Sequence, residues 1–143
     1  MNKIGFMQGR LSPIVDNKIQ AFPFGNWEKE FSIAKELGIE CMEWTLDYPH
    51  LRSNPLLLKE KKKKILSLSD ENEIEVPSLT LDCCMQRPFW KEKNKENYQY
   101  LVNDFQLILQ SAKEIGAKIL VIPLVDNGSV KNNNQFKLLK STI

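Results

Sequence analysis

Short aliphatic runs and segments of helical periodicity alternate four times along this chain. The predicted strands, each brief and rich in aliphatic side chains, are residues 3–7, 40–45, 75–81 and 118–125. The predicted helices, each with apolar residues at helical spacing, are residues 26–37, 55–71, 98–115 and 134–143. Strands that alternate with helices pair in parallel, joined by right-handed crossovers. The sequence therefore predicts an α/β protein of about four βα units in one domain.

The expected boundaries follow from residues that start or stop helices. Gly38 and Gly116 each stand where the chain leaves a helix and enters a strand, which is typical of a helix C-terminus. Asn26 is a plausible N-cap for the first helix. We expect 11–26 and 82–90 to be loops, because the first contains breakers and the second follows the third strand.

Two closures are open to such a repeat, a doubly wound sheet or a barrel. A doubly wound sheet is complete with about five strands, whereas a (β/α)8 barrel needs eight in about 250 residues. Only four units are present, and no stop signal precedes Ile143. We therefore expect a partial TIM barrel, half of a (β/α)8 barrel. Its free strand edges could be satisfied by a second copy, as a homodimer, or by another half-barrel chain.

Composition excludes several classes of partner. Hydrophobic residues make up 42% of the chain, and 20 basic against 18 acidic residues give a net charge of +2. This balance does not indicate nucleic-acid binding, and no apolar run is long enough to span a membrane. The three cysteines, Cys41, Cys83 and Cys84, form no disulfide or zinc pattern, so we expect free thiols in a cytoplasmic protein. The lysine run 59–64 is flanked by leucines, which is typical of the solvated face of an amphipathic helix.

Sites in parallel α/β folds form at the carboxyl ends of the strands. The residues that the sequence places there are Gln8, Arg10, Glu43, Trp44, Asp47, Asp82, Cys83, Cys84, Gln86, Arg87, Asp126 and Asn127. Glu43 lies within an apolar strand, where it could act as a base or orient a hydroxyl; pairing with Arg10 is the alternative. Arg10 suits a carboxylate or phosphate, and Trp44 could stack on a sugar or pack in the core. Cys84 with the lone His50 would be a weak catalytic dyad.

Several segments together resemble a known family. They are Ile4-Gly5-Phe6-Met7-Gln8-Gly9-Arg10-Leu11-Ser12-Pro13, Gln20-Ala21-Phe22-Pro23-Phe24 with Trp27, Glu30 and Phe31, Gly38-Ile39-Glu40-Cys41-Met42-Glu43-Trp44 with Asp47, and Val76-Pro77-Ser78-Leu79. These segments are similar to the first half of bacterial sugar phosphate isomerases/epimerases, in the xylose-isomerase-like barrel superfamily. The resemblance implies that residues 1–143 are the N-terminal half of such a barrel.

The resemblance also implies a chemistry. Members of the family bind a divalent cation, often Mn²⁺, and move a proton next to the carbonyl of a sugar or sugar phosphate. Their metal ligands come from strands 5 to 8, so this chain by itself is expected to bind no metal and to be inactive. The residues carried over to the substrate side are Gln8, Arg10, Glu43, Trp44 and, where relatives have a histidine, Cys84.

Three other interpretations remain open. The chain could be a non-catalytic half-barrel subunit that pairs with another chain. A small flavodoxin-like binding domain would need a fifth strand or a phosphate loop, and neither is evident. A DNA-repair endonuclease of the same superfamily would need a set of histidines and carboxylates, but the chain has one histidine.

Overall fold

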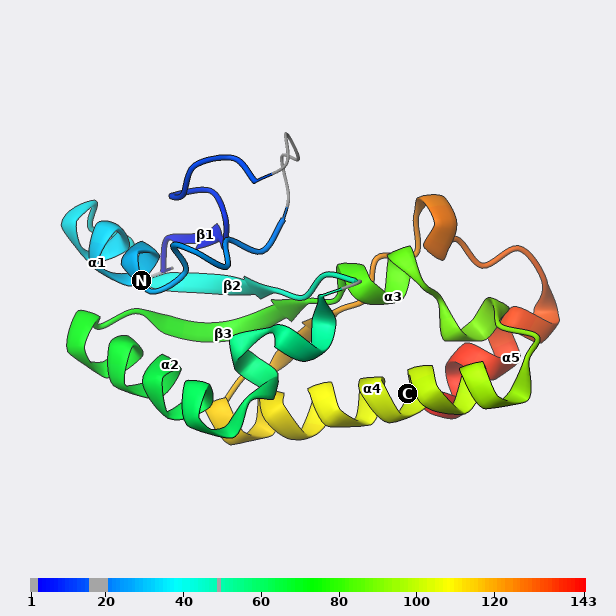
Figure 1. The fold of residues 1–143 in the computed structure, drawn as a ribbon. Helices are drawn as coiled ribbons and strands as arrows, with labels where there is room; N and C mark the ends of the chain where they lie inside the picture. The colour runs from blue at the N-terminus through cyan, green and yellow to red at the C-terminus, as the bar shows by residue number, and fades with distance from the viewer. Residues whose placement is uncertain (1–2, 16–20, 49) are drawn as a thin grey trace.

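A four-stranded parallel sheet forms the centre of the computed structural model, which describes residues 3–15, 21–48 and 50–143 (Figure 1). The strands are β1 (Gly5–Met7), β2 (Cys41–Thr45), β3 (Glu75–Thr80) and β4 (Ile119–Val121), paired in the order β1-β2-β3-β4. Each strand lies beside the one that precedes it in the chain, so the described sheet has no reversal of winding. The expected α/β class and the parallel pairing are confirmed.

Within the described residues, the strands are accompanied by five α-helices, which are α1 (Lys29–Glu36), α2 (Lys59–Asn72), α3 (Asp82–Gln86), α4 (Lys95–Ile115) and α5 (Asn133–Thr142). Short 3-10 turns occur at Leu51–Ser53, Pro55–Leu57, Phe89–Lys91 and Asp126–Gly128. α2 contacts α1, α4 and β3, and in Figure 1 α2 and α4 lie along the same side of the strands.

Alternate side chains of the strands separate the two faces of the sheet. Met42, Trp44 and Leu79 are fully buried against the helices. Helix residues such as Phe31 and Ile108 complete this core. The opposite face is open in part: Ile119 is 56% exposed and Val121 is 39% exposed.

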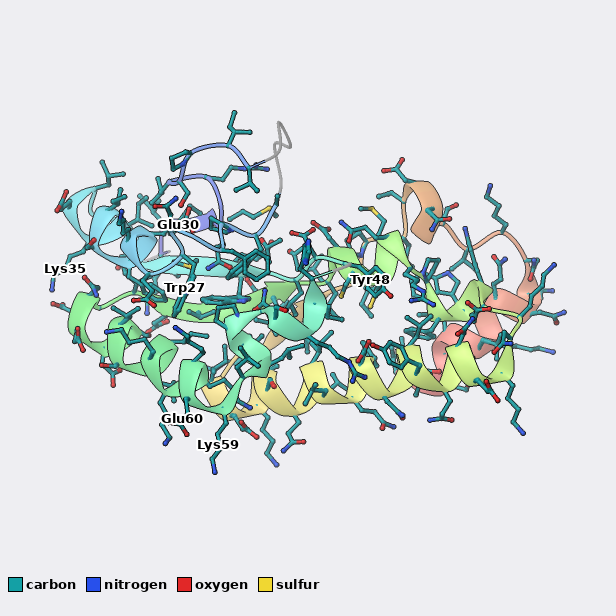
Figure 2. The ribbon with its side chains drawn as sticks, viewed as in Figure 1. Trp27, Glu30, Lys35, Tyr48, Lys59 and Glu60 are labelled. Atoms are coloured by element: carbon teal, nitrogen blue, oxygen red, sulfur yellow. The ribbon has the colours of Figure 1, made fainter. Side chains whose placement is uncertain are left out.

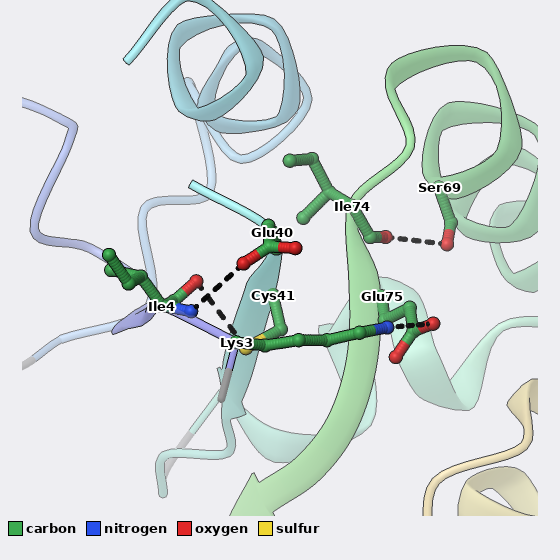
Figure 3. Close-up of polar contacts among 7 residues, drawn as sticks. All are labelled: Lys3, Ile4, Glu40, Cys41, Ser69, Ile74 and Glu75. Carbon is green, nitrogen blue, oxygen red and sulfur yellow. Dashed lines mark hydrogen bonds and ion pairs between the residues drawn. The ribbon is translucent and has the colours of Figure 1, made fainter. Parts of the chain in front are cut away.

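Polar contacts fasten the amino ends of the strands (Figure 3). The Ile4 N–H donates to the Glu40 carboxylate at 3.3 Å, and the Cys41 thiol donates to the Ile4 carbonyl at 3.6 Å. Lys3 and Glu75 form an exposed ion pair, which lowers the pKa of the Glu75 carboxyl. These contacts join the segment before β1 to β2 and β3 at the amino ends of the strands.

Helix termini agree in part with the sequence. Gly38 and Gly116 adopt left-handed φ angles of 70° and 79°, as expected of helix ends. Asn26 was the wrong N-cap: its N–H donates to the Pro23 carbonyl in a turn, and α1 begins only at Lys29. Pro23, with no N–H of its own, favours this turn over a helix start.

Three further boundaries differ from expectation. The predicted helix 55–71 begins with the 3-10 turn Pro55–Leu57, and α2 starts only at Lys59, because Leu58 between them is extended. The predicted loop 82–90 contains α3 and a 3-10 turn, because Phe89 and Trp90 are buried and draw the segment onto the core. The predicted strand 118–125 is paired only over β4, since its carboxyl half leaves β3 to reach the turn at Asp126. The predicted loop 11–26 lies partly outside the described residues.

Candidate functional site

The Glu43 carboxylate is held by two hydroxyl groups on the open face of the sheet. The Ser78 hydroxyl donates to Oε2 at 2.9 Å, and the Thr80 hydroxyl donates to Oε1 at 2.5 Å. Glu43 is only half-buried, and a hollow of about 270 Å³ lies before it, lined also by Met7 and Cys41. A carboxylate with both oxygens fixed by hydroxyl donors is oriented, and it can accept a proton or a further hydrogen bond from a ligand.

A β-bulge in β3 brings Glu43 next to Ser78 and Thr80. Cys41 pairs with Glu75 but Glu43 pairs with Ser78, so two residues of β3 oppose Met42 alone. One of the two is Pro77, which has no N–H to give to a ladder. Without the extra residue, Glu43 would face Pro77, and the Ser78 and Thr80 side chains would turn to the other face.

Gln8, at the end of β1, is fully buried rather than exposed to a ligand. Its N–H donates to the Glu43 carbonyl at 2.9 Å, and its side-chain oxygen accepts from the Thr45 N–H at 3.2 Å. Within the described chain, the Gln8 Nε2 and the Thr45 hydroxyl have no hydrogen-bond partner. Buried polar groups normally have hydrogen-bond partners. These two groups, at the carboxyl ends of β1 and β2, can therefore each bond a water molecule or a ligand atom.

Arg10 is exposed beside β1. Its guanidinium donates to the Met7 sulfur at 4.0 Å, and it forms no ion pair with Glu43 or any other described carboxylate. The Arg10–Glu43 pairing that the sequence left open is therefore absent from the described contacts.

Trp44 and Cys84 both lie on the helix-covered side. The Trp44 indole N–H donates to the Asn54 side-chain oxygen at 3.0 Å, and its ring centre lies 5.7 Å from that of Trp27. Trp44 is therefore a core residue here, the second of the two roles that the sequence left open. Cys84, on α3, is 6% exposed and lines a small cavity against α4 together with residues such as Phe105. Neither side chain reaches the hollow in front of Glu43.

A chain of hydrogen bonds joins the segments that follow β2, β3 and β4. The Gln86 side chain donates to the Asp47 carboxylate at 2.9 Å and accepts from the Tyr48 N–H at 2.6 Å. The Asn127 side chain donates to the Gln86 carbonyl at 3.0 Å, and Lys91 donates to the Asn127 carbonyl. The sequence placed Asp47, Gln86 and Asn127 at strand ends one by one, and the structure shows that they meet.

Sequence reasoning missed the role of Glu30 on α1 (Figure 2). Its carboxylate is fully buried and accepts from the Gly9 N–H at 3.0 Å and the Leu11 N–H at 3.1 Å. Burial raises the pKa of this carboxyl, although the backbone donors oppose the shift. Glu30 thus fixes the loop that carries Gln8 and Arg10. The signal was its place on the apolar face of the predicted helix, three residues after Trp27.

No protein-family model matches this chain, and no curated protein matches it significantly in sequence. The resemblance to sugar phosphate isomerases/epimerases therefore stays a prediction from its motifs.

Two properties of the described residues bear on cofactor and location. Nowhere in 3–15, 21–48 or 50–143 do three or more His, Cys, Asp or Glu side chains gather closely enough to bind a metal ion. Across the same ranges, no helix has the length and apolarity to cross a membrane.

Proposed function

We propose that this chain is the N-terminal half of a (β/α)8 barrel and supplies one wall of the substrate site of a sugar or sugar phosphate isomerase/epimerase. The observation that carries the proposal is the oriented Glu43 carboxylate on the uncovered face of a sheet whose strands run in sequential order. Sequential order with helices along one side is the arrangement of a barrel segment, whereas doubly wound sheets reverse at a switch point.

The proposed role of Glu43 is general base or hydroxyl acceptor at a carbon next to a carbonyl. Ser78 and Thr80 fix both oxygens, so the carboxylate needs little reorientation when a substrate enters. The two hydroxyls also occupy some of the lone pairs of the Glu43 carboxylate. The remaining lone pairs favour contact with a single hydroxyl or C–H group of the substrate.

The divalent cation expected of the resembled family finds no fitting set of residues in the described part of this chain. Such an ion would polarise the carbonyl next to which the proton moves. The ligands would then come from the strands that complete the barrel, and the residues described here would act on the substrate alone.

The test uses the chain assembled with a second half that completes the barrel. In deuterated water, NMR would follow the exchange of the substrate C–H proton next to the carbonyl of a ketose or ketose phosphate for deuterium. We expect Glu43→Gln to lower the exchange rate by at least about 100-fold, in line with the loss of a general base. Glu36→Gln, which changes an exposed carboxylate at the end of α1, is the control and should leave the rate unchanged. Equal rates for Glu43→Gln and wild type would remove Glu43 from the reaction, and turnover by the isolated chain would contradict the half-barrel assignment.

A second candidate is a non-catalytic half-barrel subunit, favoured by the exposed Ile119 and Val121 on the open face. An unpaired aliphatic face and two free strand edges favour association with further strands. Analytical ultracentrifugation separates the two: a stable symmetric dimer that binds no sugar supports the subunit role.

A further inference from the structure

A second hollow lies among the segments that follow β3 and β4, apart from the one in front of Glu43. It has a volume of about 160 Å³ and is lined by Gln86, Arg87, Pro88, Lys91, Glu92 and Asn127. Two of these six side chains are cationic, and both are half-buried. A cation that is partly removed from water gains more from a nearby negative charge than a fully exposed cation does.

Neither cation forms an ion pair within the described chain. No described carboxylate lies within 4.0 Å of the charged nitrogens of Arg87 or Lys91. The acidic residue of the hollow, Glu92, is already engaged, because its Oε1 accepts from the Lys93 and Asn94 N–H groups at 2.9 Å each. Those hydrogen bonds leave the charge of Glu92 in place, so the lining carries two positive charges against one negative charge, a net charge of +1.

Each of the two side chains donates one hydrogen bond within the described residues and keeps further donors. Arg87 donates through Nη1 to the Tyr48 hydroxyl, and its guanidinium lies 5.1 Å from the centre of that ring. Lys91 donates one of its three protons to the Asn127 carbonyl. The Nη2 and Nε of Arg87 and two protons of Lys91 remain for a ligand, and a guanidinium fork with an ammonium group matches the oxygens of a phosphate.

The local fold explains why the two cations share one hollow. Phe89 and Trp90, between them in sequence, are each 1% exposed and pack edge to face at 5.0 Å. These buried aromatic rings anchor the 3-10 turn Phe89–Lys91, and Pro88 fixes its entry. The flanking Arg87 and Lys91 are thereby turned to the surface together.

We propose that this hollow binds the phosphate of a phosphomonoester, with Arg87 and Lys91 as its ligands. The identification of the rest of the ligand as a sugar rests on the proposed function, whereas the phosphate contact rests on the hollow alone. The substrate class of the site would then be sugar phosphates rather than free sugars.

The experiment is isothermal titration calorimetry of the full chain at low ionic strength, with inorganic phosphate, a hexose 6-phosphate and the unphosphorylated hexose as probes. We expect saturable binding of both phosphates and at least tenfold weaker binding of the free hexose. Arg87→Gln and Lys91→Gln should each weaken phosphate binding by about tenfold, the loss of one charge-assisted hydrogen bond. Lys93→Gln removes an exposed charge that does not line the hollow and should change the affinity less than twofold.

Two results would overturn the proposal: absence of saturable phosphate binding by the wild type, or equal weakening by Lys93→Gln, which would indicate general surface charge. Because Arg87→Gln also removes the contact with Tyr48, thermal melting of each variant must accompany the titrations, and Lys91→Gln supplies the independent arm. Binding is measured without turnover, so its failure is distinguishable from an unchanged proton-exchange rate in Glu43→Gln.

Discussion

Replacing Glu30 tests whether one buried carboxylate fixes the loop after β1. Its side chain is fully buried, and it accepts from the Gly9 and Leu11 N–H groups at 3.0 and 3.1 Å. Glu30→Ala removes both acceptors and leaves two backbone donors without partners. A hydrogen bond to a charged group contributes roughly 1.5–3 kcal/mol to stability. The substitution also removes the desolvation cost of the buried carboxylate, and this offsets part of the loss. We expect the free energy of unfolding to fall by about 3 kcal/mol, and the melting temperature by roughly 10 °C.

Urea unfolding followed by tryptophan fluorescence measures this change. Glu30→Gln keeps an acceptor oxygen and should lose only about 1 kcal/mol. Glu28→Ala is the matched control on the same segment: its carboxylate is exposed and lies 3.8 Å from Lys61, so its loss should cost under about 0.5 kcal/mol. If Glu30→Ala unfolds within about 0.5 kcal/mol of wild type, the loop is not held by this carboxylate.

The pH dependence of the same variants has a defined sign. Burial raises the pKa of Glu30 above its ordinary 4.5, so the folded protein binds this proton more tightly than the unfolded chain. The charged form is therefore the less stable one in the fold, and the wild type loses stability relative to Glu30→Gln as pH rises through the folded-state pKa. Below the unfolded-state pKa the carboxyl is protonated in both states, and the stability of the wild type relative to Glu30→Gln is then highest. A difference that widens in favour of wild type with rising pH would refute the raised pKa.

Three further predictions concern packing, thiols and a buried charge. Gly128→Ala would bring a Cβ to 2.5 Å from the Pro123 carbonyl oxygen, so we expect a loss of about 2 kcal/mol or more in urea unfolding. Cys83 is buried and its neighbouring thiol raises its pKa well above 9.0, so it should resist Ellman's reagent at pH 8 until the chain is unfolded in urea. Arg52→Met leaves the Asp104 carboxylate, 4% exposed, without its 2.8 Å cation and should lower the free energy of unfolding by about 2 kcal/mol. Asp104→Asn in the same background should restore most of that stability, and failure to do so would show that packing of Arg52 is the cause.

Local sequence patterns predicted the order and type of the main elements well. Helix α4 has its apolar residues on one face, and Phe105 and Ile108 are buried as that periodicity requires. Gly116 ends the helix with a positive φ, because a residue without a Cβ adopts that conformation at little cost. Asn94, the N-cap of α4, accepts from the Asn97 N–H at 3.0 Å. An asparagine before a helix predicts such a cap, but the helix was predicted from its apolar face alone.

The site depended on contacts that no local pattern encodes. Period-two alternation places Glu43 and Trp44 on opposite faces, but only the helices show which face is covered. The meeting of Glu43 with Ser78 and Thr80 required the bulge at Pro77, a matter of register between strands far apart in sequence.

The sequence by itself determined the α/β alternation, the helix faces and the carboxylate within β2, because periodicity and glycine conformation act within a few residues. The tertiary structure alone decided which strand neighbours which, which face stays open, and that Arg87 and Lys91 share one hollow. Strand register and the joining of strand ends depend on packing between distant segments, and that packing is fixed only when the whole sheet forms.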